Sequence, residues 1–270
     1  MEADRIVEGD CLDALPSLPG GIVDLVLSSP PYADRRKAAY GGPAPEGYLD
    51  WFLPRSAELL RVLKPTGSFV LNIKEHCRNG ERQTYVLELV LALRRQGWRW
   101  VEEYIWAKTT SVPGKWPNRL RDAWEHCYHF AKQRKFAMYQ DAVRVPMAES
   151  TKLRAIRAVA AGEFARQEMA TGSGFGTNRT HWAGRDAVLP DNVLRLPLEC
   201  SNRKHPAAFP LALPDFFIRL LTSTGDLVLD PFCGSGTACL AAKSLGRRYL
   251  GIEKLPAYCA EAKLRLENSK

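Results

Sequence analysis

Hydrophobic positions along the chain follow two patterns, short continuous runs and helical spacing, and segments with these patterns alternate. Short apolar runs at residues 23–29 and 67–73 predict buried parallel strands. Residues 48–63 and 84–95 instead carry apolar positions at helical spacing, and each is followed by a helix-stop signal. The same patterns predict further strands at residues 5–8, 100–108, 125–132, 225–232 and 248–253, and helices at 214–222, 238–245 and 258–266. Alternating strands and helices predict an α/β fold with a doubly wound, mostly parallel sheet.

The middle of the chain breaks this alternation. Residues 150–170 form a basic stretch with helical spacing, and residues 171–180 are rich in glycine. Long irregular segments inside compact domains are often functional. We therefore expect one α/β domain made from residues 1–132 and 196–270, with residues 133–195 inserted between its halves.

Composition excludes several classes of protein. The 270 residues are 46% hydrophobic and 25% charged, which is ordinary for a globular protein and unlike a disordered tail or a fibre. No apolar run reaches the roughly 18 residues that a membrane helix needs, and the mixed, acidic first ten residues do not resemble a signal peptide. Seven scattered cysteines without a C-x-x-C pair argue against a disulfide framework or a metal site. These features predict a reducing, cytoplasmic location.

The net charge of +8 is concentrated in the centre of the chain. Between Lys108 and Lys204 there are 17 Lys and Arg against 9 Asp and Glu, so this stretch carries the whole excess. A basic segment is often no more than a solvated surface, but it is also typical of proteins that bind a polyanion such as nucleic acid.

Residues 227–253 predict a nucleotide site. A strand runs into a glycine-rich turn with Gly234 and Gly236, then a helix, then a second strand that ends in Glu253. Glycines let the backbone approach a ligand closely, and an acid at the end of the second strand can bind a ribose diol. The spacing of these glycines differs from the G-x-G-x-x-G motif of dinucleotide sites. This difference favours a nucleoside as the ligand over a dinucleotide. The alternative is an ordinary strand–helix turn.

Ser29-Pro30-Pro31-Tyr32 follows an apolar strand. The two prolines remove two amide donors, so the preceding carbonyls are free to accept hydrogen bonds, and Tyr32 offers a flat ring. Such a group could hold an exocyclic amine and stack on its heterocycle. The alternative is a simple strand terminator.

Together, the two motifs resemble one family. Ser-Pro-Pro-Tyr at 29–32, followed far along the chain by Asp-Pro-Phe-Cys-Gly-Ser-Gly-Thr at 230–237, resembles the beta class of DNA amino-methyltransferases that use S-adenosyl-L-methionine. The order resembles a circular permutation of the usual Rossmann-like methyltransferase sheet. The resemblance implies that residues 133–195 are a basic DNA target-recognition region. The resemblance to this family covers both α/β regions of the chain and leaves its central region unmatched.

The resemblance also implies roles for individual residues. Gly9-Asp10-Cys11 and Lys204-His205-Pro206 are similar to segments that contact the cofactor in this family. The implied cofactor-binding residues are Asp10, Cys11, His205, Asp230, Phe232, Gly234, Ser235, Gly236, Thr237, Glu253 and Lys254. The implied catalytic residues are Ser29, Pro30, Pro31 and Tyr32.

The first letter of the tetrapeptide bears on the substrate. In this family Ser-Pro-Pro-Tyr is typical of N4-cytosine enzymes, and Asp-Pro-Pro-Tyr of N6-adenine enzymes. We therefore favour cytosine N4 in double-stranded DNA, with the base flipped out of the helix, and keep adenine N6 as the main alternative. A methyltransferase acting on RNA or a small molecule, or a DNA-binding module without activity, explains fewer of the residues.

DNA contacts are expected from the basic centre, where Lys and Arg would bind phosphates and a few side chains would read base edges. The candidates are Arg154, Arg157, Phe175, Arg179 and His181. Family members are often dimeric, and some accompany a restriction endonuclease. The sequence leaves open whether this chain forms a homodimer or has a cognate endonuclease.

Overall fold

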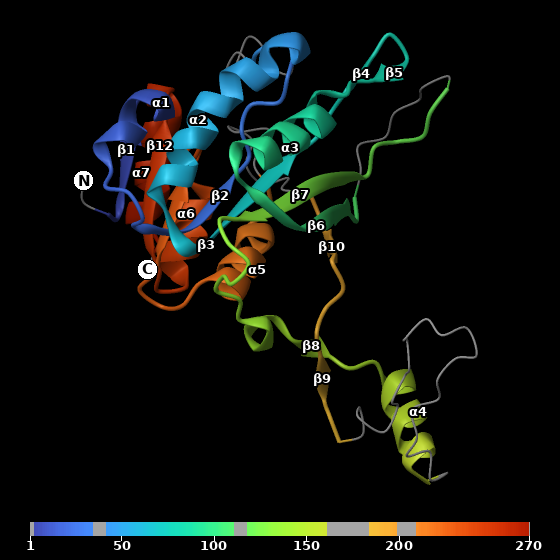
Figure 1. The fold of residues 1–270 in the computed structure, drawn as a ribbon. Helices are drawn as coiled ribbons and strands as arrows, with labels where there is room; N and C mark the ends of the chain where they lie inside the picture. Colours follow the sequence, from blue (N-terminus) through green and yellow to red (C-terminus); the bar gives the residue numbers. More distant parts are fainter. Residues whose placement is uncertain (1–2, 35–41, 111–117, 161–183, 199–208, 270) are drawn as a thin grey trace. The chain divides into compact units, whose positions relative to one another are not determined.

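The computed structural model describes residues 3–34, 42–110, 118–160, 184–198 and 209–269. The chain divides into two compact units (Figure 1). One comprises Met1–Tyr139 and Asn192–Lys270, and the other is Gln140–Asp191.

The larger unit is built on an eight-stranded sheet with the order β1-β12-β11-β2-β3-β7-β6-β10 in the described part of the chain. Its strands are β1 (Arg5–Glu8), β2 (Val23–Ser28), β3 (Leu63–Ile73), β6 (Arg99–Lys108), β7 (Trp124–Ala131), β10 (Val193–Leu196), β11 (Leu227–Asp230) and β12 (Arg248–Glu253). Every neighbouring pair is parallel except those of β7, which runs antiparallel to both β3 and β6. The expected α/β fold with a mostly parallel sheet is therefore confirmed.

The helices pack in two sets. α1 (Cys11–Ala14), α2 (Tyr48–Val62) and α3 (Tyr85–Gln96) form one set, and α5 (Ala212–Leu221), α6 (Thr237–Ser244) and α7 (Pro256–Glu267) form the other. The first set shares a core with alternate residues of the strands, such as Val26, Phe69 and Leu71. The intervening strand residues Leu25 and Val70 are also fully buried. Burial on both faces explains why these strands are continuous apolar runs.

Some element boundaries differ from the sequence prediction. β3 begins at Leu63, so the Lys64-Pro65 pair starts a strand instead of only stopping a helix. α3 ends as expected at Gly97, whose φ of 114° lies in the left-handed region that glycine tolerates. Among the elements that the sequence did not predict are the edge strand β10 and the hairpin of β4 (Cys77–Arg78) and β5 (Glu81–Arg82).

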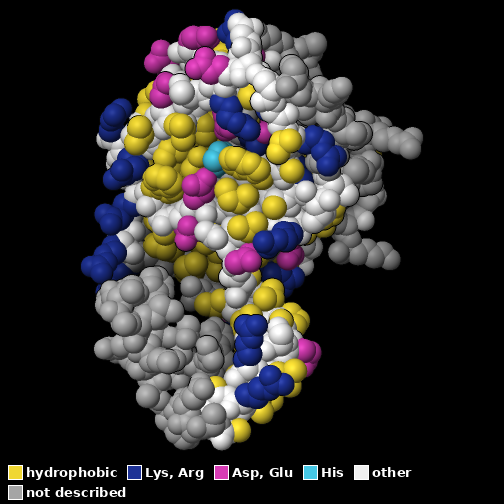
Figure 2. Space-filling model, turned by 90° about the vertical axis from the view of Figure 1, so that its right-hand side faces the viewer, with side chains coloured by type: hydrophobic (Ala, Val, Ile, Leu, Met, Phe, Trp, Pro, Cys, Tyr) yellow, Lys and Arg dark blue, Asp and Glu magenta, His cyan; other side chains and the backbone are white. Residues whose placement is uncertain are grey.

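The side of the larger unit that carries β6 and β7 has an apolar surface. Figure 2 shows hydrophobic side chains gathered near the middle of this view, with Lys and Arg side chains distributed around them. Among the described residues, Trp100 and Val101 of β6 and Leu87 and Leu91 of α3 are exposed. No described helix combines the length and the apolar composition that a membrane crossing requires.

The smaller unit contains α4 (Glu149–Ala160) and a short antiparallel pair, β8 (Val145–Pro146) with β9 (Ala187–Val188). A helix was expected over residues 150–170, and its first half is α4. The remainder, with the glycine-rich segment, lies outside the described residues. Ala155 and Ala158 of α4 are buried, whereas its Leu153, Ile156 and both arginines are exposed.

Candidate active site

The carboxyl ends of five parallel strands meet at one edge of the sheet. β1, β12, β11, β2 and β3 are neighbours in that order and run in the same direction. The segments that follow the first four of them begin at Gly9, Lys254, Pro231 and Ser29, and all leave the sheet at this edge. Ligands of open α/β sheets bind at the carboxyl ends of the strands. The tetrapeptide and the glycine-rich turn, although far apart in the sequence, therefore open on the same side of the sheet.

A buried carboxyl group joins these two motifs. Ser28, at the end of β2, donates a hydrogen bond from Oγ to Oδ1 of Asp230, at the end of β11, over 2.6 Å. The amide of Phe232 donates to the same oxygen over 3.1 Å. Burial raises the pKa of Asp230 to about 7; the two hydrogen bonds oppose this rise, and the Glu253 carboxylate adds to it. Asp230 therefore exchanges its proton near neutral pH, at the junction of the two motifs.

The glycine-rich turn has the backbone that its sequence predicts. Gly234 and Gly236 have φ angles of 51° and 79°, in the left-handed region. The Gly234 amide donates to Oε2 of Glu253 over 2.8 Å, and the Leu255 amide donates to Oε1 over 2.8 Å. A carboxylate oxygen can accept more than one hydrogen bond. Glu253 is thus held by the backbone and retains acceptor positions for a diol.

Asp10 is held in place by charged and backbone groups. Its Oδ1 caps α1 by accepting from the Leu12 amide over 3.0 Å, and Nη2 of Arg55 bonds to both carboxylate oxygens over 2.9 and 3.0 Å. Partial burial acts to raise the pKa of Asp10, but the Leu12 hydrogen bond and the Arg55 guanidinium hold it below its ordinary value. Cys11 is buried, and burial raises the pKa of its thiol to about 12. The thiol is therefore not a nucleophile.

Aromatic rings line the same region. The ring of Phe232 lies 5.5 Å from that of Trp51 and 6.4 Å from that of Phe52, between ring centroids. The guanidinium of Arg55 lies over the Trp51 ring at 4.4 Å. Sequence reasoning had not assigned Trp51 or Arg55 to this region, because both lie within a helix whose spacing suggested only core packing.

The carbonyl groups of Pro30 and Pro31 in the tetrapeptide differ in their hydrogen bonds. The Pro31 carbonyl accepts a hydrogen bond from the Tyr48 hydroxyl over 2.9 Å. For the Pro30 carbonyl, no hydrogen bond is found within the described part of the chain. Ser29 Oγ donates to the Tyr32 hydroxyl over 3.3 Å. The serine hydroxyl thus donates its hydrogen bond to Tyr32, and the lone pairs of its oxygen remain available to another donor.

Tyr32 in turn bonds to residues of the next two strands. Its hydroxyl donates to Oε2 of Glu125, on β7, over 2.7 Å and lies 3.3 Å from Oδ1 of Asn72, on β3. Glu125 also accepts from Asn72 Nδ2 over 3.2 Å and from Lys108 Nζ over 2.5 Å. Burial raises the pKa of Tyr32 well above its ordinary value, and the Glu125 carboxylate adds to the rise. The phenol therefore stays protonated and acts as a donor.

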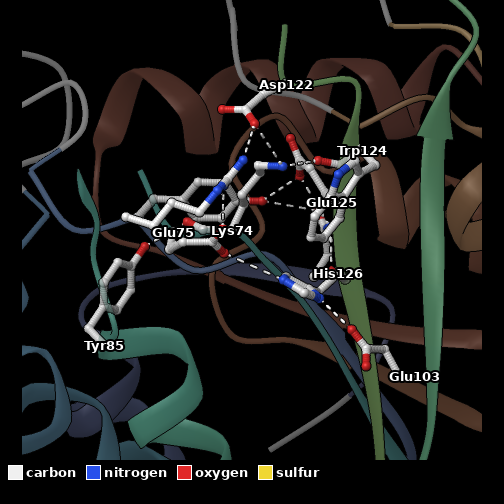
Figure 3. Close-up of polar contacts among 11 residues, drawn as sticks. Lys74, Glu75, Tyr85, Glu103, Asp122, Trp124, Glu125 and His126 are labelled. Atoms are coloured by element: carbon white, nitrogen blue, oxygen red, sulfur yellow. Dashed lines mark hydrogen bonds and ion pairs between the residues drawn. The ribbon is translucent and has the colours of Figure 1, made fainter. Parts of the chain in front are cut away.

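A network of polar contacts fixes the start of β7 (Figure 3). His126 lies between Glu103 and Glu75, at 2.5 Å and 3.4 Å. Lys74 donates to the Trp124 carbonyl over 2.5 Å and lies over the Trp124 ring. Burial acts to raise the pKa of Glu75, but its contacts with His126 and Lys74 lower it to about 2. The residues on both sides of Glu125 are thus anchored.

Two residues of the glycine-rich turn have protein partners. Nη1 of Arg265, on α7, donates to the Ser235 carbonyl and Oγ over 2.6 and 2.9 Å, and to Thr237 Oγ1 over 3.2 Å. Ser235 and Thr237 are both buried. In this structure these side chains hold the turn against α7. Any contact with a cofactor stays a prediction for both residues.

Comparison with known proteins identifies the family. The family model described as DNA methylase, covering N6 and N4 methyltransferases, matches residues 23–264. The chain belongs to the N6/N4 DNA methylase family. It is 29% identical to the type II methyltransferase M.PvuII of Proteus hauseri, over 97% of this chain and 83% of that protein. It is 28% identical to the type II methyltransferase M.XycI of Xanthomonas campestris pv. cyanopsidis, over 99% of this chain and 89% of that protein.

A solved structure agrees with this assignment. The fold matches PvuII DNA methyltransferase (cytosine-N4-specific) with a TM-score of 0.73 and 27% identity, over 98% of this chain and 86% of the other. The resemblance inferred from the two motifs is therefore confirmed at the level of the family. As a member of the N6/N4 DNA methylases, the chain is a DNA methyltransferase.

The DNA-binding candidates of this methylase are only partly described. Arg154 and Arg157 are exposed and three residues apart on α4, so they lie on one face of the helix. Phe175, Arg179 and His181 lie outside the described residues, as does the cofactor candidate His205. Their roles stay predictions.

Proposed function

We propose that this chain transfers a methyl group from S-adenosyl-L-methionine to the exocyclic N4 amine of cytosine, flipped out of double-stranded DNA at a specific site. The observation that carries the proposal is the shared edge of the sheet. The hydrogen bond from Ser28 to Asp230 holds the strand before Ser29 beside the strand that leads into the glycine-rich turn. A base held at Ser29 would therefore lie near a cofactor held at Glu253.

The residues at this edge fit a nucleoside. Glu253 has accepting positions for a ribose diol, and Asp10 is an acid placed to accept from an adenine amine. A Cβ added at Gly9 would meet no atom within 4 Å, so the backbone there is open to a ligand. The ring of Phe232 adds an apolar wall. When bound, S-adenosyl-L-methionine supplies an electrophilic methyl group.

The tetrapeptide provides the contacts that the target amine requires. The lone pair of an exocyclic amine is delocalised into the base, so the amine is a weak nucleophile. Ser29 Oγ and the Pro30 carbonyl each accept a hydrogen bond from the amine. These two bonds orient the amine and raise the electron density on its nitrogen. Tyr32 stacks on the flipped base. A serine hydroxyl is a weak base, so the proton released on methylation passes to solvent.

Two observations favour cytosine over adenine. The tetrapeptide begins with Ser, as in the N4-cytosine enzymes of this family. The solved structure that matches at a TM-score of 0.73 is also described as cytosine-N4-specific. Adenine N6 remains the alternative, because the family includes both activities.

Product analysis tests the proposal directly. The purified chain is incubated with tritiated S-adenosyl-L-methionine and genomic DNA amplified in vitro, which carries no modified bases. The DNA is then digested to nucleosides and analysed by mass spectrometry. We expect N4-methyldeoxycytidine. N6-methyldeoxyadenosine would refute the choice of base, and the absence of any methylated nucleoside would refute the proposal. Sequencing of the product with modified-base detection then maps the recognition site.

A variant tests the role of Ser29. Ser29→Ala removes one of the two acceptors for the amine, and we expect the methylation rate to fall by about 100-fold, as when one oriented hydrogen bond to a reacting group is lost. Cofactor affinity, measured by calorimetry, should not change, because Ser29 lies on the base side of the site. A normal rate in this variant would remove Ser29 from the mechanism.

A further inference from the structure

The Ser29 hydroxyl is the first member of a chain of hydrogen bonds that ends at a carboxylate. Ser29 Oγ donates to the Tyr32 hydroxyl over 3.3 Å, and this hydroxyl donates to Oε2 of Glu125 over 2.7 Å. The other oxygen of Glu125 accepts from the Lys108 ammonium over 2.5 Å. Two strands, β6 and β7, and the tetrapeptide are therefore joined by one path of hydrogen bonds.

A hydroxyl group can donate one hydrogen bond and accept two, so the direction of such a chain is not fixed by the hydroxyls themselves. A carboxylate without a proton can only accept. Glu125 receives hydrogen bonds from Tyr32, Lys108 and Asn72, and all three are donated to it. The carboxylate therefore sets the direction of every hydrogen bond that precedes it in the chain.

From the direction of these bonds we infer that Glu125 is a positioning residue: it orients the Tyr32 hydroxyl so that Ser29 Oγ directs its proton away from the target base and presents its lone pairs to the amine. This inference rests on the proposed function, since it concerns the atom that accepts from the target amine. Without Glu125, the Tyr32 hydroxyl could turn its proton toward Ser29. Ser29 could then turn its own proton toward the amine and lose its role as an acceptor.

The surroundings of Glu125 support this role. Its side chain is only 12% exposed, and that of Lys108 is 14% exposed, so water competes little for the pair. Trp124 and His126 flank Glu125 on β7 and are anchored by Lys74, Glu75 and Glu103 (Figure 3). The raised pKa of Tyr32 keeps its proton in place for donation.

The test compares Glu125→Gln, Tyr32→Phe and the double variant, with Glu103→Gln as the matched control. Gln has the shape of Glu, but its Nε2 can face Tyr32 as a donor and reverse the chain. Phe keeps the stacking ring and removes the hydroxyl. Glu103→Gln removes the charge of a neighbouring carboxylate that does not contact Tyr32, and the Gln amide can still hydrogen-bond to His126 Nδ1, so the anchoring of β7 is kept. The rate of methyl transfer is measured in a single turnover on a duplex with the mapped site, and KM is measured separately for the cofactor and for DNA.

We expect Glu125→Gln and Tyr32→Phe each to lower the single-turnover rate by about tenfold or more, with both KM values unchanged, since an oriented hydrogen bond is lost. The double variant should be no slower than Tyr32→Phe, because the series of hydrogen bonds is already interrupted at Tyr32 and the two effects are coupled. Glu103→Gln should keep the wild-type rate. A wild-type rate in Glu125→Gln, or losses that multiply in the double variant, would overturn the inference.

Two further outcomes are informative. If Glu125→Gln does not fold, Tyr32→Phe alone tests the inference, because a wild-type rate without the phenolic hydroxyl is incompatible with the proposed series of hydrogen bonds. If the wild-type protein methylates no DNA, the proposed function fails. A wild-type protein that methylates DNA together with an unaffected Glu125→Gln refutes only the inference.

Discussion

The sharpest prediction concerns Asp230, whose carboxyl group lies buried where the two motifs meet. Its side chain accepts hydrogen bonds from Ser28 and from the Phe232 amide, and the residue is 2% exposed. Burial raises its pKa from 3.8 to about 7. The folded protein therefore holds this proton more tightly than the unfolded chain, and the free energy of unfolding decreases as pH rises between these two pKa values.

The size of this effect follows from the pKa difference. Each pKa unit corresponds to about 1.4 kcal/mol, so the full loss is on the order of 4 kcal/mol, of which about 3 kcal/mol falls between pH 5 and pH 8. Asp230→Asn removes the titration and can still accept from both Ser28 and Phe232. The difference in unfolding free energy between the variant and the wild type should therefore shift in favour of the variant by about 3 kcal/mol across this range.

Urea unfolding of both proteins, followed by circular dichroism at several pH values between about 5 and 8, measures this difference. The other titratable groups are common to both proteins, so their contributions cancel in the comparison. A difference that stays constant with pH, to within about 0.5 kcal/mol, would show that Asp230 ionises in the folded protein as it does in the unfolded chain.

Three other variants test the remaining parts of the site. Gly236→Ala places a side chain at a φ of 79°, so we expect the unfolding free energy to fall by about 1–3 kcal/mol; unchanged urea unfolding would contradict this strain. Arg55→Gln removes the guanidinium whose Nη2 bonds to both oxygens of Asp10 and should raise the Kd for S-adenosyl-L-methionine by about tenfold in calorimetry. An unaltered Kd would show that Asp10 does not contact the cofactor. Replacing both Arg154 and Arg157 by Ala should lower the slope of log affinity for DNA against log salt by about two. An unchanged slope would place phosphate contacts elsewhere.

Much of the candidate active site at this edge of the sheet was predictable from the sequence because it depends on local signals. A short apolar run followed by two prolines marks the end of β2, and glycines with an acid at the end of the next strand mark the turn after β11. Parallel strands then place these ends on one edge, without detailed knowledge of side-chain contacts. The structure confirms this arrangement of Ser29 and Glu253 at one edge.

The contacts of Tyr32 could not be predicted in the same way. Glu125 reaches Tyr32 only because β7 runs antiparallel to β3, with Asn72 opposite Cys127. Spacing within a single strand does not reveal the register of its partner. One signal was present: Asn72 is a buried amide among the apolar residues 69–73 at the end of β3, and such a group requires hydrogen-bond partners. The strand β10 was missed for a related reason, since its four residues carry no pattern of their own.

The position of β11 and β12 within the sheet has a consequence for the newly synthesised chain. These strands follow all the other described strands in the sequence, yet they lie between β1 and β2, which come first. While a ribosome is still making the protein, β1 and β2 have no neighbour between them, and the sheet edge that carries the glycine-rich turn and Glu253 is missing. Nascent chains should therefore be unable to modify DNA until β11 and β12 have emerged, and a product truncated before residue 225 should have none of this activity.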